Sequence, residues 1–407
     1  MRDVFRPRTA DQRFPSVAAM ERAARRRIPR FAHDYMAGGI GREDGLKRNR
    51  LELDRVRLVP RYLAEVPPPE LGTTILGQKA AAPFGAAPVG LTGLMWPDAP
   101  KHIARAAAAA NLPVGLSTYA TASIEEVGAI AGRLMWFQLY PLRDESIEQD
   151  LLARFAAVGG EVLVVTVDIP GPTRRERDIA NGLSVPPRRD WRTYLQAALR
   201  PEWSLAMLRA GVPEFRNVTR YVPPGADATT TLDFIGGIMA AHVSPDRLRR
   251  YRDLWKGKLV VKGVLDVRDA RVALDCGADG IVVSNHGGWQ LDAAPTAPEV
   301  LPAICQAVGT QVAVLADGGA RSGLDIARLL AKGAEFVLLG RAMAFSVAAM
   351  GAPGPAHALH VLKEELRGTL VQLGCADHRQ LAAFLQGVAP DAALSGAGAV
   401  EPRPTAR

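Results

Sequence analysis

The feature that most constrains the fold of this chain is an alternation of short apolar runs with longer helical stretches. Eight such runs follow one another, and most are continuously apolar rather than alternately apolar and polar. Continuous apolar runs are typical of parallel strands covered on both faces. Helical patterns fill the intervals, for example at 99–110, 146–158 and 266–275. The candidate strands are 84–89, 113–117, 135–140, 162–168, 259–263, 280–284, 312–316 and 336–340.

Eight strands separated by helices, with no sign of a reversal, predict an α/β protein that closes into a (β/α)8 TIM barrel. The alternative is a doubly wound open sheet, which usually has a Gly-rich turn after its first strand. Residues 87–90 contain a single glycine, Gly90, and no G-x-G-x-x-G pattern. The barrel is therefore the preferred prediction.

Two regions do not belong to a plain barrel. Residues 1–82 precede the first strand and predict two or three helices followed by a small β-turn unit near 73–79. Within the 83–388 barrel, residues 171–257 form an insertion after the fourth strand that is far longer than an ordinary loop. Residues 389–407, rich in Ala, Gly and Pro, are expected to form a flexible tail.

Composition narrows the class of protein. The chain has a net charge of +8, but no Lys/Arg block joins a recognisable nucleic-acid motif, so nucleic-acid binding is not expected. Cys276, Cys305 and Cys375 are too scattered for a disulfide framework or a metal site, which favours a reduced, cytoplasmic setting. No apolar run reaches the roughly 20 residues that a membrane-spanning helix needs.

The middle of the insertion, residues 188–220, contains seven Arg and three acidic residues, interleaved with Trp191, Trp203 and several Leu. A basic segment of this kind can lie at a bilayer interface. The alternative is a lid or an oligomer contact over the barrel mouth.

Polar and glycine residues recur where the predicted strands end. In a TIM barrel the C-terminal ends of all strands open into one shared pocket, so these residues are expected to meet there. They are Pro88, Val89, Gly90, Ser117, Gln138, Tyr140, Thr166, Asp168, Lys262, Ser284, His286, Asp317, Gly318, Gly319, Arg321, Gly340 and Arg341.

The last two strand ends, 317–321 and 340–341, have the composition of a phosphate site. Glycines let backbone N–H groups approach an anion, and Arg321 and Arg341 can bind it through paired hydrogen bonds. Barrels commonly bind phosphate after strands seven and eight. The alternative is a pair of ordinary tight turns.

Lys262 and His286 are the two candidates for chemistry. Burying an unpaired lysine is costly, so Lys262 indicates either a Schiff base or a fixed cation beside an electron-rich cofactor. His286 has no second His or Cys near it, which argues against a metal site. A general base oriented by Asp168 is the preferred interpretation over a structural histidine.

Residues 284–288, Ser-Asn-His-Gly-Gly, followed by Gln290, Leu291 and Asp292, resemble the signature of the FMN-dependent 2-hydroxy acid oxidases and dehydrogenases. The resemblance runs from about residue 31 to 375. It also includes the segments 34–35, 137–140, 166–168, 174–176, 262–263 and 317–319.

This resemblance implies a role for each residue. His286 would take a substrate proton as two electrons pass to flavin N5, and Asp168 would stabilise the imidazolium. Tyr35, Tyr140 and Arg175 would bind the hydroxyl and carboxylate of an (S)-2-hydroxy acid. Lys262 would stabilise the reduced flavin. The remaining FMN-binding residues would be Pro88, Val89, Gly90, Ser117, Gln138, Thr166, Ser284, Asp317, Gly318, Gly319, Arg321, Gly340 and Arg341.

Two segments are similar to the mandelate and lactate dehydrogenase branch of this family. Residues 90–97 have Gly90 where oxidases often carry Ala, and residues 200–205 and 211–213 look like a membrane-binding insertion. This similarity implies a quinone-type electron acceptor, peripheral attachment to the inner face of the cell membrane and a homotetramer. A hydrogen-peroxide-forming oxidase is the alternative.

One residue departs from the family pattern. Trp289 stands where most members have a second arginine for the substrate carboxylate. Loss of a charged contact worth about 1.5–3 kcal/mol would weaken binding of simple hydroxy acids roughly tenfold to a hundredfold. Three explanations compete: Trp289 stacks on a bulky or aromatic substrate; the substrate is an ester, amide or modified peptide; or Arg174 or Arg177 supplies the charge. A non-catalytic flavin-binding protein is a further alternative.

Overall fold

The computed structural model describes residues 8–171, 173–183, 191–226, 230, 234, 236–239 and 242–387. Residues 188–190 of the basic segment and the predicted tail lie outside them. Eight parallel strands close into a barrel, which confirms the predicted fold and excludes the open sheet. They are β3 (Phe84–Ala86), β4 (Val114–Ser117), β5 (Met135–Leu139), β6 (Val162–Thr166), β7 (Lys258–Val264), β8 (Gly280–Val283), β9 (Ala313–Ala316) and β10 (Phe336–Leu339).

The strands form because their side chains are buried on both faces. Every residue of β5 and β6 is buried, as the continuous apolar runs predict. The register between β7 and β8 shifts after Lys262, at Gly263, whose φ of 105° is open to glycine. This irregularity lies at the end of the strand that carries the predicted cofactor lysine.

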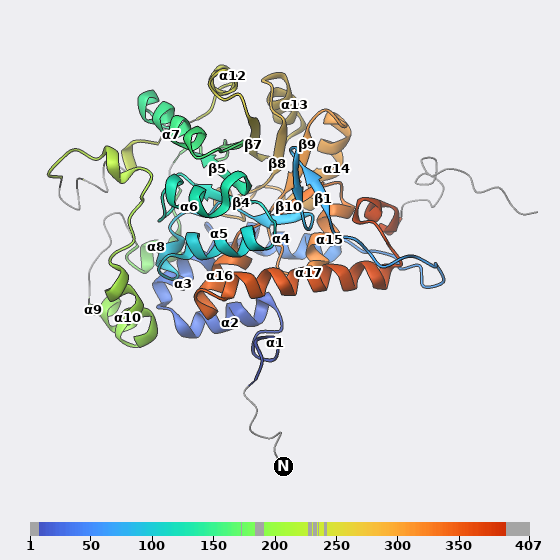
Figure 1. Cartoon of the computed structure of the whole chain (residues 1–407), viewed down its shortest axis with the longest axis horizontal. Helices are drawn as coiled ribbons and strands as arrows, with labels where there is room; N and C mark the ends of the chain where they lie inside the picture. The colour runs from blue at the N-terminus through green and yellow to red at the C-terminus, as the bar shows by residue number, and fades with distance from the viewer. Residues whose placement is uncertain are drawn as a thin grey trace, which may run out of the picture.

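Helices surround the barrel (Figure 1). Several begin at side-chain caps; Ser123 and Glu126, for example, form a capping box at the start of α6. The barrel helices are α5 (Ala99–Ala109), α6 (Ile124–Ala131), α7 (Glu145–Ala157), α12 (Pro245–Leu254), α13 (Val267–Asp275), α14 (Ala297–Val308), α15 (Gly323–Ala331), α16 (Arg341–Met350) and α17 (Gly354–Leu373). Short 3₁₀ helices are η1 (Thr92–Leu94), η2 (Gly132–Leu134), η3 (Thr219–Tyr221) and η4 (His378–Phe384).

The N-terminal segment contains α1 (Ala10–Arg13), α2 (Val17–Arg27), α3 (Arg30–Ala37) and α4 (Asp44–Arg55). This is more than the two or three helices predicted, because α1 is a single capped turn too short to give a periodic pattern. The expected β-turn unit is a hairpin of β1 (Thr73–Ile75) and β2 (Gln78–Ala80). A second apolar core, which includes Met20, Phe31 and Phe345, joins α2 and α3 to α16. It holds the N-terminal segment on the barrel.

The described part of the insertion contains α8 (Glu176–Ala180), α9 (Trp191–Ala198) and α10 (Pro201–Ala210). These helices lie beside α2 and α3 at one end of the molecule (Figure 1). Trp203 of α10 packs edge-on against Phe31 of α3, and Glu202 pairs with Arg27 at 2.9 Å. The predicted range 171–257 also includes α12, which occupies the position of the barrel helix between β6 and β7.

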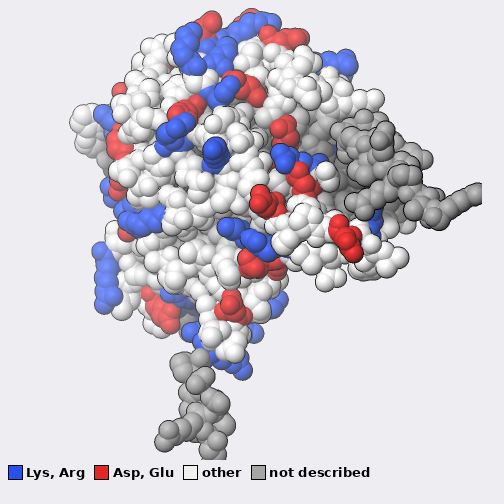
Figure 2. Space-filling view, turned by 45° about the vertical axis from the view of Figure 1, so that its right-hand side comes forward, with Lys and Arg blue, Asp and Glu red and all other residues white. Residues whose placement is uncertain are grey.

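The surface charge and the helix lengths are relevant to the nucleic-acid and membrane predictions. On the face shown in Figure 2, basic and acidic side chains are interspersed among uncharged ones. Charges of both signs therefore alternate on this face. Among the described helices, none combines the length and the apolar character needed to cross a membrane.

Candidate active site

A cavity of about 610 Å³ opens at the C-terminal ends of the strands, in the size range of small-molecule sites. Its walls come from the strand ends, α3, the start of the insertion and the loop after β8. The predicted residues that line it are Tyr35, Pro88, Val89, Gly90, Tyr140, Arg175, Lys262, His286, Trp289, Asp317, Gly318, Gly319, Arg321, Gly340 and Arg341.

Five other predicted residues, namely Ser117, Gln138, Thr166, Asp168 and Ser284, lie behind this lining. Asp168 and Ser284 each contact a lining residue directly, as described below. Ser117 lines a small adjacent cavity together with Val89 and Gly340. Gln138 and Thr166 are buried at the ends of β5 and β6.

The central feature of the cavity is the side chain of His286. Its Nδ1 lies 2.9 Å from Oδ1 of Asp168. Burial would raise the pKa of Asp168, but the charge and hydrogen bond of His286 outweigh it and lower the pKa. An ionised Asp168 accepts a hydrogen bond from Nδ1–H of His286, so the ring would exchange a proton at Nε2. Nε2 is therefore available to take a proton.

The hydroxyl of Tyr140 lies 3.4 Å from Nε2 of His286. Burial, reinforced by the charge of Asp168, raises the pKa of Tyr140 well above its usual value, so the phenol keeps its proton. A substrate hydroxyl bound beside these two groups would contact both a donor and a proton acceptor.

The loop that carries His286 has an unusual backbone. His286 adopts a left-handed conformation, with φ of 55°, which side chains other than glycine rarely adopt. Such conformations cluster at functional sites. At the next position, a Cβ on Gly287 would lie 2.7 Å from Nη1 of Arg341. The loop therefore needs glycine where it passes the arginine.

Lys262 is buried and contacts two side chains. Its Nζ lies 2.9 Å from Oγ of Ser284 and 3.0 Å from Oδ2 of Asp317. Burial would lower the pKa of Lys262, but Asp317 and Asp168 outweigh it and raise the pKa. Lys262 is therefore a fixed ammonium cation. A Schiff base would require a neutral amine, so the cofactor-cation interpretation is favoured over the Schiff base.

Arg321 and Arg341 form a second cationic region. Among the residues that the structure describes, neither forms an ion pair with a carboxylate; their guanidinium groups donate to backbone carbonyl oxygens. Burial lowers the pKa of Arg321 to about 10, and burial together with the charge of Arg321 lowers that of Arg341 to about 9. Gly318 and Gly319, both with positive φ, line the same region. A phosphate would relieve this accumulation of positive charge.

Arg341 also has a structural role that the sequence does not indicate. Its guanidinium donates to the carbonyl oxygens of Met36, Gly38 and Gly287, each at 2.7 Å. It thereby joins the N-terminal segment to the loop of His286. Three of its five N–H groups are occupied in this way, and the others remain for an anion.

Unpaired polar atoms test whether a flavin fits. The amide nitrogen and oxygen of Gln138 and the hydroxyl of Thr166 are buried without a hydrogen-bond partner. Buried polar groups are rarely left unsatisfied, so these atoms indicate a polar ligand. A flavin ring presents both donors and acceptors along one edge, and Lys262 lies beside Thr166 on the neighbouring strand, β7. The residues present therefore fit FMN.

Tyr35 and Arg175, the residues predicted to bind the substrate, lie together in the cavity wall. Cζ of Arg175 lies 5.0 Å from the centre of the Tyr35 ring. Nη2 of Arg175 pairs with Asp178 at 2.9 Å, whereas its Nη1 is buried without a partner. This unsatisfied N–H group is suited to a carboxylate.

Trp289 lies in the cavity wall rather than pointing away from it. Its Nε1–H donates to the carbonyl oxygen of Gly38 at 2.6 Å, which fixes the indole. The ring is 6.1 Å from that of His286, and the guanidinium carbons of Arg175 and Arg341 are 4.8 and 5.2 Å from its centre. At this position, where most members of the family have an arginine, the cavity therefore has a rigid aromatic side chain.

Several lining residues were not predicted from the sequence, namely Tyr119, Arg143, Phe215 and Met239. Tyr119 follows the end of β4 by two residues and could have been found by extending that strand end. Phe215 and Met239 belong to the insertion, where no periodic pattern indicates which side chains face inward. The partner of Arg175, Asp178, was also missed.

A parallel barrel whose strand ends gather a histidine–carboxylate pair, a buried lysine and a basic phosphate region defines a flavin-dependent oxidoreductase. Residues 24–386 match the family model described as FMN-dependent dehydrogenase. The chain belongs to this family, and it is an FMN-dependent 2-hydroxy acid dehydrogenase or oxidase. The interpretation as a non-catalytic flavin-binding protein is therefore set aside.

Relatives of known name support this assignment. The chain is 44% identical over 366 residues to an L-lactate dehydrogenase of Caulobacter vibrioides (strain NA1000 / CB15N), covering 89% of this chain and 94% of the relative. It is 41% identical over 370 residues to an L-lactate dehydrogenase of Pseudomonas syringae pv. syringae (strain B728a), covering 89% and 96%.

Solved structures agree. The monotopic membrane protein (S)-mandelate dehydrogenase superposes with a TM-score of 0.88 at 36% identity, covering 93% of this chain and 100% of that one. Mandelate oxidase with (S)-4-hydroxymandelic acid superposes with a TM-score of 0.78 at 36% identity, covering 90% and 97%.

Proposed function

We propose that this protein oxidises (S)-2-hydroxy acids with an aromatic or bulky side chain to the corresponding 2-oxo acids. The observation that carries the proposal is the fixed indole of Trp289 in the cavity wall, beside the unsatisfied Nη1 of Arg175. Tyr119, Phe215 and Met239 add further apolar surface to the cavity. A small acid such as lactate would leave this surface uncovered, whereas an aromatic ring would bury it.

The substrate's carboxylate would be held by Arg175 and Tyr35. Of the competing explanations for Trp289, a replacement cation from the insertion has the least support, because Arg174 and Arg177 do not line the cavity. A substrate without a free carboxylate would leave the buried Nη1 of Arg175 facing a neutral group, which is unfavourable. A carboxylate bound by one arginine is the better fit.

The reaction requires a proton acceptor and an electron acceptor. Nε2 of His286 would take a proton from the substrate, and Asp168 would stabilise the imidazolium that results. Tyr140 would donate a hydrogen bond to the substrate hydroxyl. FMN, when bound, supplies the site that accepts the two electrons. Lys262 would hold its positive charge where negative charge develops.

The next electron acceptor is proposed to be a quinone rather than oxygen. Gly90 lines the cavity, and the chain resembles the monotopic membrane protein (S)-mandelate dehydrogenase over 93% of its length. A peripheral attachment to the membrane would bring the site close to a lipid-soluble acceptor. A hydrogen-peroxide-forming oxidase is the second candidate, because mandelate oxidase is also a structural neighbour.

The proposed membrane contact is the surface of α9 and α10. It exposes the apolar side chains of Trp191, Tyr194, Leu195, Leu199, Leu205, Leu208 and Val212. Leu208 and Val212 are 82% and 81% exposed. Trp203 anchors this hairpin to the N-terminal core, so the apolar side chains are presented on a fixed support.

Anaerobic bleaching of the flavin tests the substrate. We expect (S)-mandelate and (S)-phenyllactate to reduce the flavin at least about tenfold more efficiently than (S)-lactate. Mandelamide and methyl mandelate serve as matched compounds without the carboxylate. Faster reduction by lactate, or equal reduction by the amide, would contradict the proposal. Parallel assays with oxygen and a soluble quinone would separate the dehydrogenase from the oxidase.

A further inference from the structure

The two residues that face the proposed carboxylate come from different parts of the chain. Tyr35 belongs to α3 of the N-terminal segment, and Arg175 is the N-cap residue of α8 in the insertion. Neither lies on a barrel strand. Their relative position therefore depends on how α8 is held against α3.

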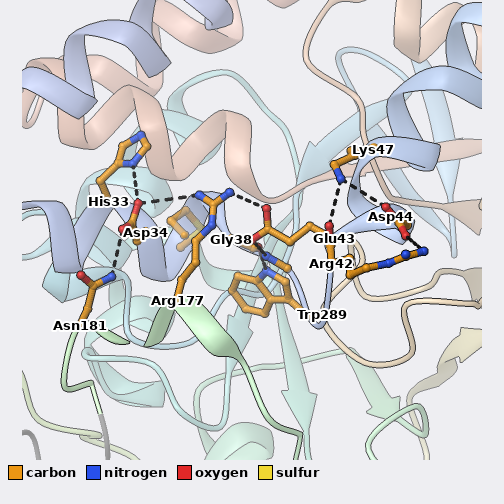
Figure 3. Close-up of polar contacts among 12 residues, drawn as sticks. His33, Asp34, Gly38, Arg42, Glu43, Asp44, Lys47, Arg177, Asn181 and Trp289 are labelled. Carbon is orange, nitrogen blue, oxygen red and sulfur yellow. Dashed lines mark hydrogen bonds and ion pairs between the residues drawn. The ribbon is translucent and has the colours of Figure 1, made fainter. Parts of the chain in front are cut away.

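Arg177 of α8 makes the contacts that connect the two helices. Its guanidinium pairs with Glu43 and lies 3.8 Å from Oδ1 of Asp34, the residue next to Tyr35. Figure 3 shows Arg177 reaching toward both carboxylates, with Asn181 next to Asp34. Nδ2 of Asn181 donates to Asp34 at 2.9 Å. Arg177 and Asn181 therefore attach both ends of α8 to the N-terminal segment.

The two acidic partners are themselves held firmly. Oε1 of Glu43 accepts a hydrogen bond from the backbone N–H of Gly39 at 3.1 Å. Glu43 also has a φ of 61°, a left-handed conformation that persists only where the surroundings hold it. Burial would raise the pKa of Asp34, but hydrogen bonds from His33, Asn181 and Arg30 outweigh it and keep the carboxylate ionised.

We propose that Arg177 is a positioning residue for substrate binding: by bridging Glu43 and Asp34, it sets the distance between Arg175 and Tyr35. An ion pair between two exposed side chains would have little effect. This one differs because the side chains of Glu43 and Asp34 are only 14% and 11% exposed. The inference rests on the proposed function in one respect, namely that Arg175 and Tyr35 bind a carboxylate.

The test uses the FMN-loaded protein and two ligands. Phenylacetate has the ring and carboxylate but no hydroxyl to oxidise, so its dissociation constant, measured from the flavin difference spectrum, reports positioning without turnover. Anaerobic reduction by (S)-mandelate then gives a half-saturating concentration and a limiting rate. The variants are Arg177→Met, which removes the charge, and Arg177→Lys, which keeps it.

We expect Arg177→Met to raise both the dissociation constant of phenylacetate and the half-saturating mandelate concentration about tenfold. The limiting rate should stay within about twofold, because the contacts of His286 are unchanged. Arg177→Lys should recover most of the affinity. Arg249→Met, which removes an exposed ion pair with Asp246 on α12, is the matched control and should match the wild type.

Glu43→Gln provides a second route if Arg177→Met folds poorly, since the amide oxygen can still accept from Gly39. It should show the same loss of affinity with the limiting rate retained. Unchanged phenylacetate binding in both variants, or a fall in the limiting rate at constant affinity, would overturn the inference. If wild-type protein binds phenylacetate but is not reduced by mandelate, the proposed substrate is contradicted. The phenylacetate dissociation constants of the variants would still test the positioning role of Arg177.

Discussion

Gly263 and Asp168 are packed so closely that a Cβ on Gly263 would lie 2.5 Å from Cγ of Asp168. Gly263 adopts a φ of 105° directly after Lys262, at the register shift between β7 and β8. The glycine therefore makes room for the carboxylate that orients His286. A backbone irregularity in β7 thus determines the position of a side chain in the loop that follows β6.

Gly263→Ala should displace Asp168 from His286. The strained backbone should lower stability by about 1–3 kcal/mol, and misplacement of the carboxylate should slow flavin reduction about tenfold or more. Thermal unfolding and stopped-flow reduction measure the two effects. Gly368→Ala on α17 is the control, because a Cβ there meets nothing within 4 Å. If Gly263→Ala reduced its flavin at the wild-type rate, Asp168 would have to keep its contact with His286 despite the added methyl group.

His286→Gln should leave the protein folded with FMN bound but slow flavin reduction by at least about a hundredfold, because the proton acceptor is lost. The absorbance spectrum gives the flavin content, and anaerobic stopped-flow gives the rate. Binding of phenylacetate should persist, since Arg175 and Tyr35 are unaltered. Retained turnover would eliminate His286 as the base.

Trp289→Arg should improve the use of small hydroxy acids. An added guanidinium beside Arg175 would lower the KM for lactate by about tenfold if this position contacts the carboxylate. Aromatic acids should lose affinity at the same time. Trp289→Phe keeps an aromatic side chain in the wall, although it loses the hydrogen bond to Gly38 and part of the ring area, so it should retain the wild-type preference. An unaltered lactate KM in the arginine variant would count against this role.

Substrate binding should depend on pH through Asp178. Burial, outweighing the attraction of Arg175, raises the pKa of Asp178 to about 6. Below this pH Asp178 becomes neutral, so the charge of Arg175 is no longer shared with it. Phenylacetate should therefore bind more tightly at about pH 5.5 than at about pH 7.5.

The titration has a direct control. Asp178→Asn should bind phenylacetate with an affinity that varies little over the same pH range. Both proteins compared, with Asp178 and with Asp178→Asn, should also carry His286→Gln, so that the imidazole does not contribute to the pH dependence. A pH dependence that survives in Asp178→Asn would assign it to another group.

Leu208→Glu combined with Val212→Glu should release the protein from membranes. Burial of each apolar side chain is worth about 1.5–3 kcal/mol, so the pair should lower binding to anionic lipid vesicles by at least about tenfold. Sedimentation with vesicles measures the bound fraction. Val371→Glu on α17, 56% exposed and outside this surface, is the matched control. Equal sedimentation of both variants would favour a lid or an oligomer contact.

Much of the fold could be predicted because its signals are local. The strands are continuous apolar runs. In β5 and β6 every residue of the strand is buried, as such a run predicts. The polar residues at the strand ends, such as Lys262 and His286, could be placed in one pocket because barrel geometry brings those ends together. The position of each side chain followed from the position of its strand.

Other parts of the site could not be predicted because they depend on contacts between distant segments. Nothing in the sequence near Arg177 indicates that it pairs with Glu43, 134 residues earlier. The contacts of Arg341 with carbonyl groups are equally non-local, since backbone acceptors carry no sequence signal. Phe215 and Met239 line the cavity from an insertion whose path no periodic pattern specifies.

The contacts of Arg341 also have a consequence for how the protein is made. This arginine donates to carbonyl groups 305 and 303 residues earlier in the chain, and to Gly287 in the loop of His286. During synthesis, the N-terminal turn and this loop are therefore complete long before the residue that joins them emerges from the ribosome. The loop of His286 can therefore gain these contacts only after the final strand, β10, when Arg341 at the start of α16 has been made.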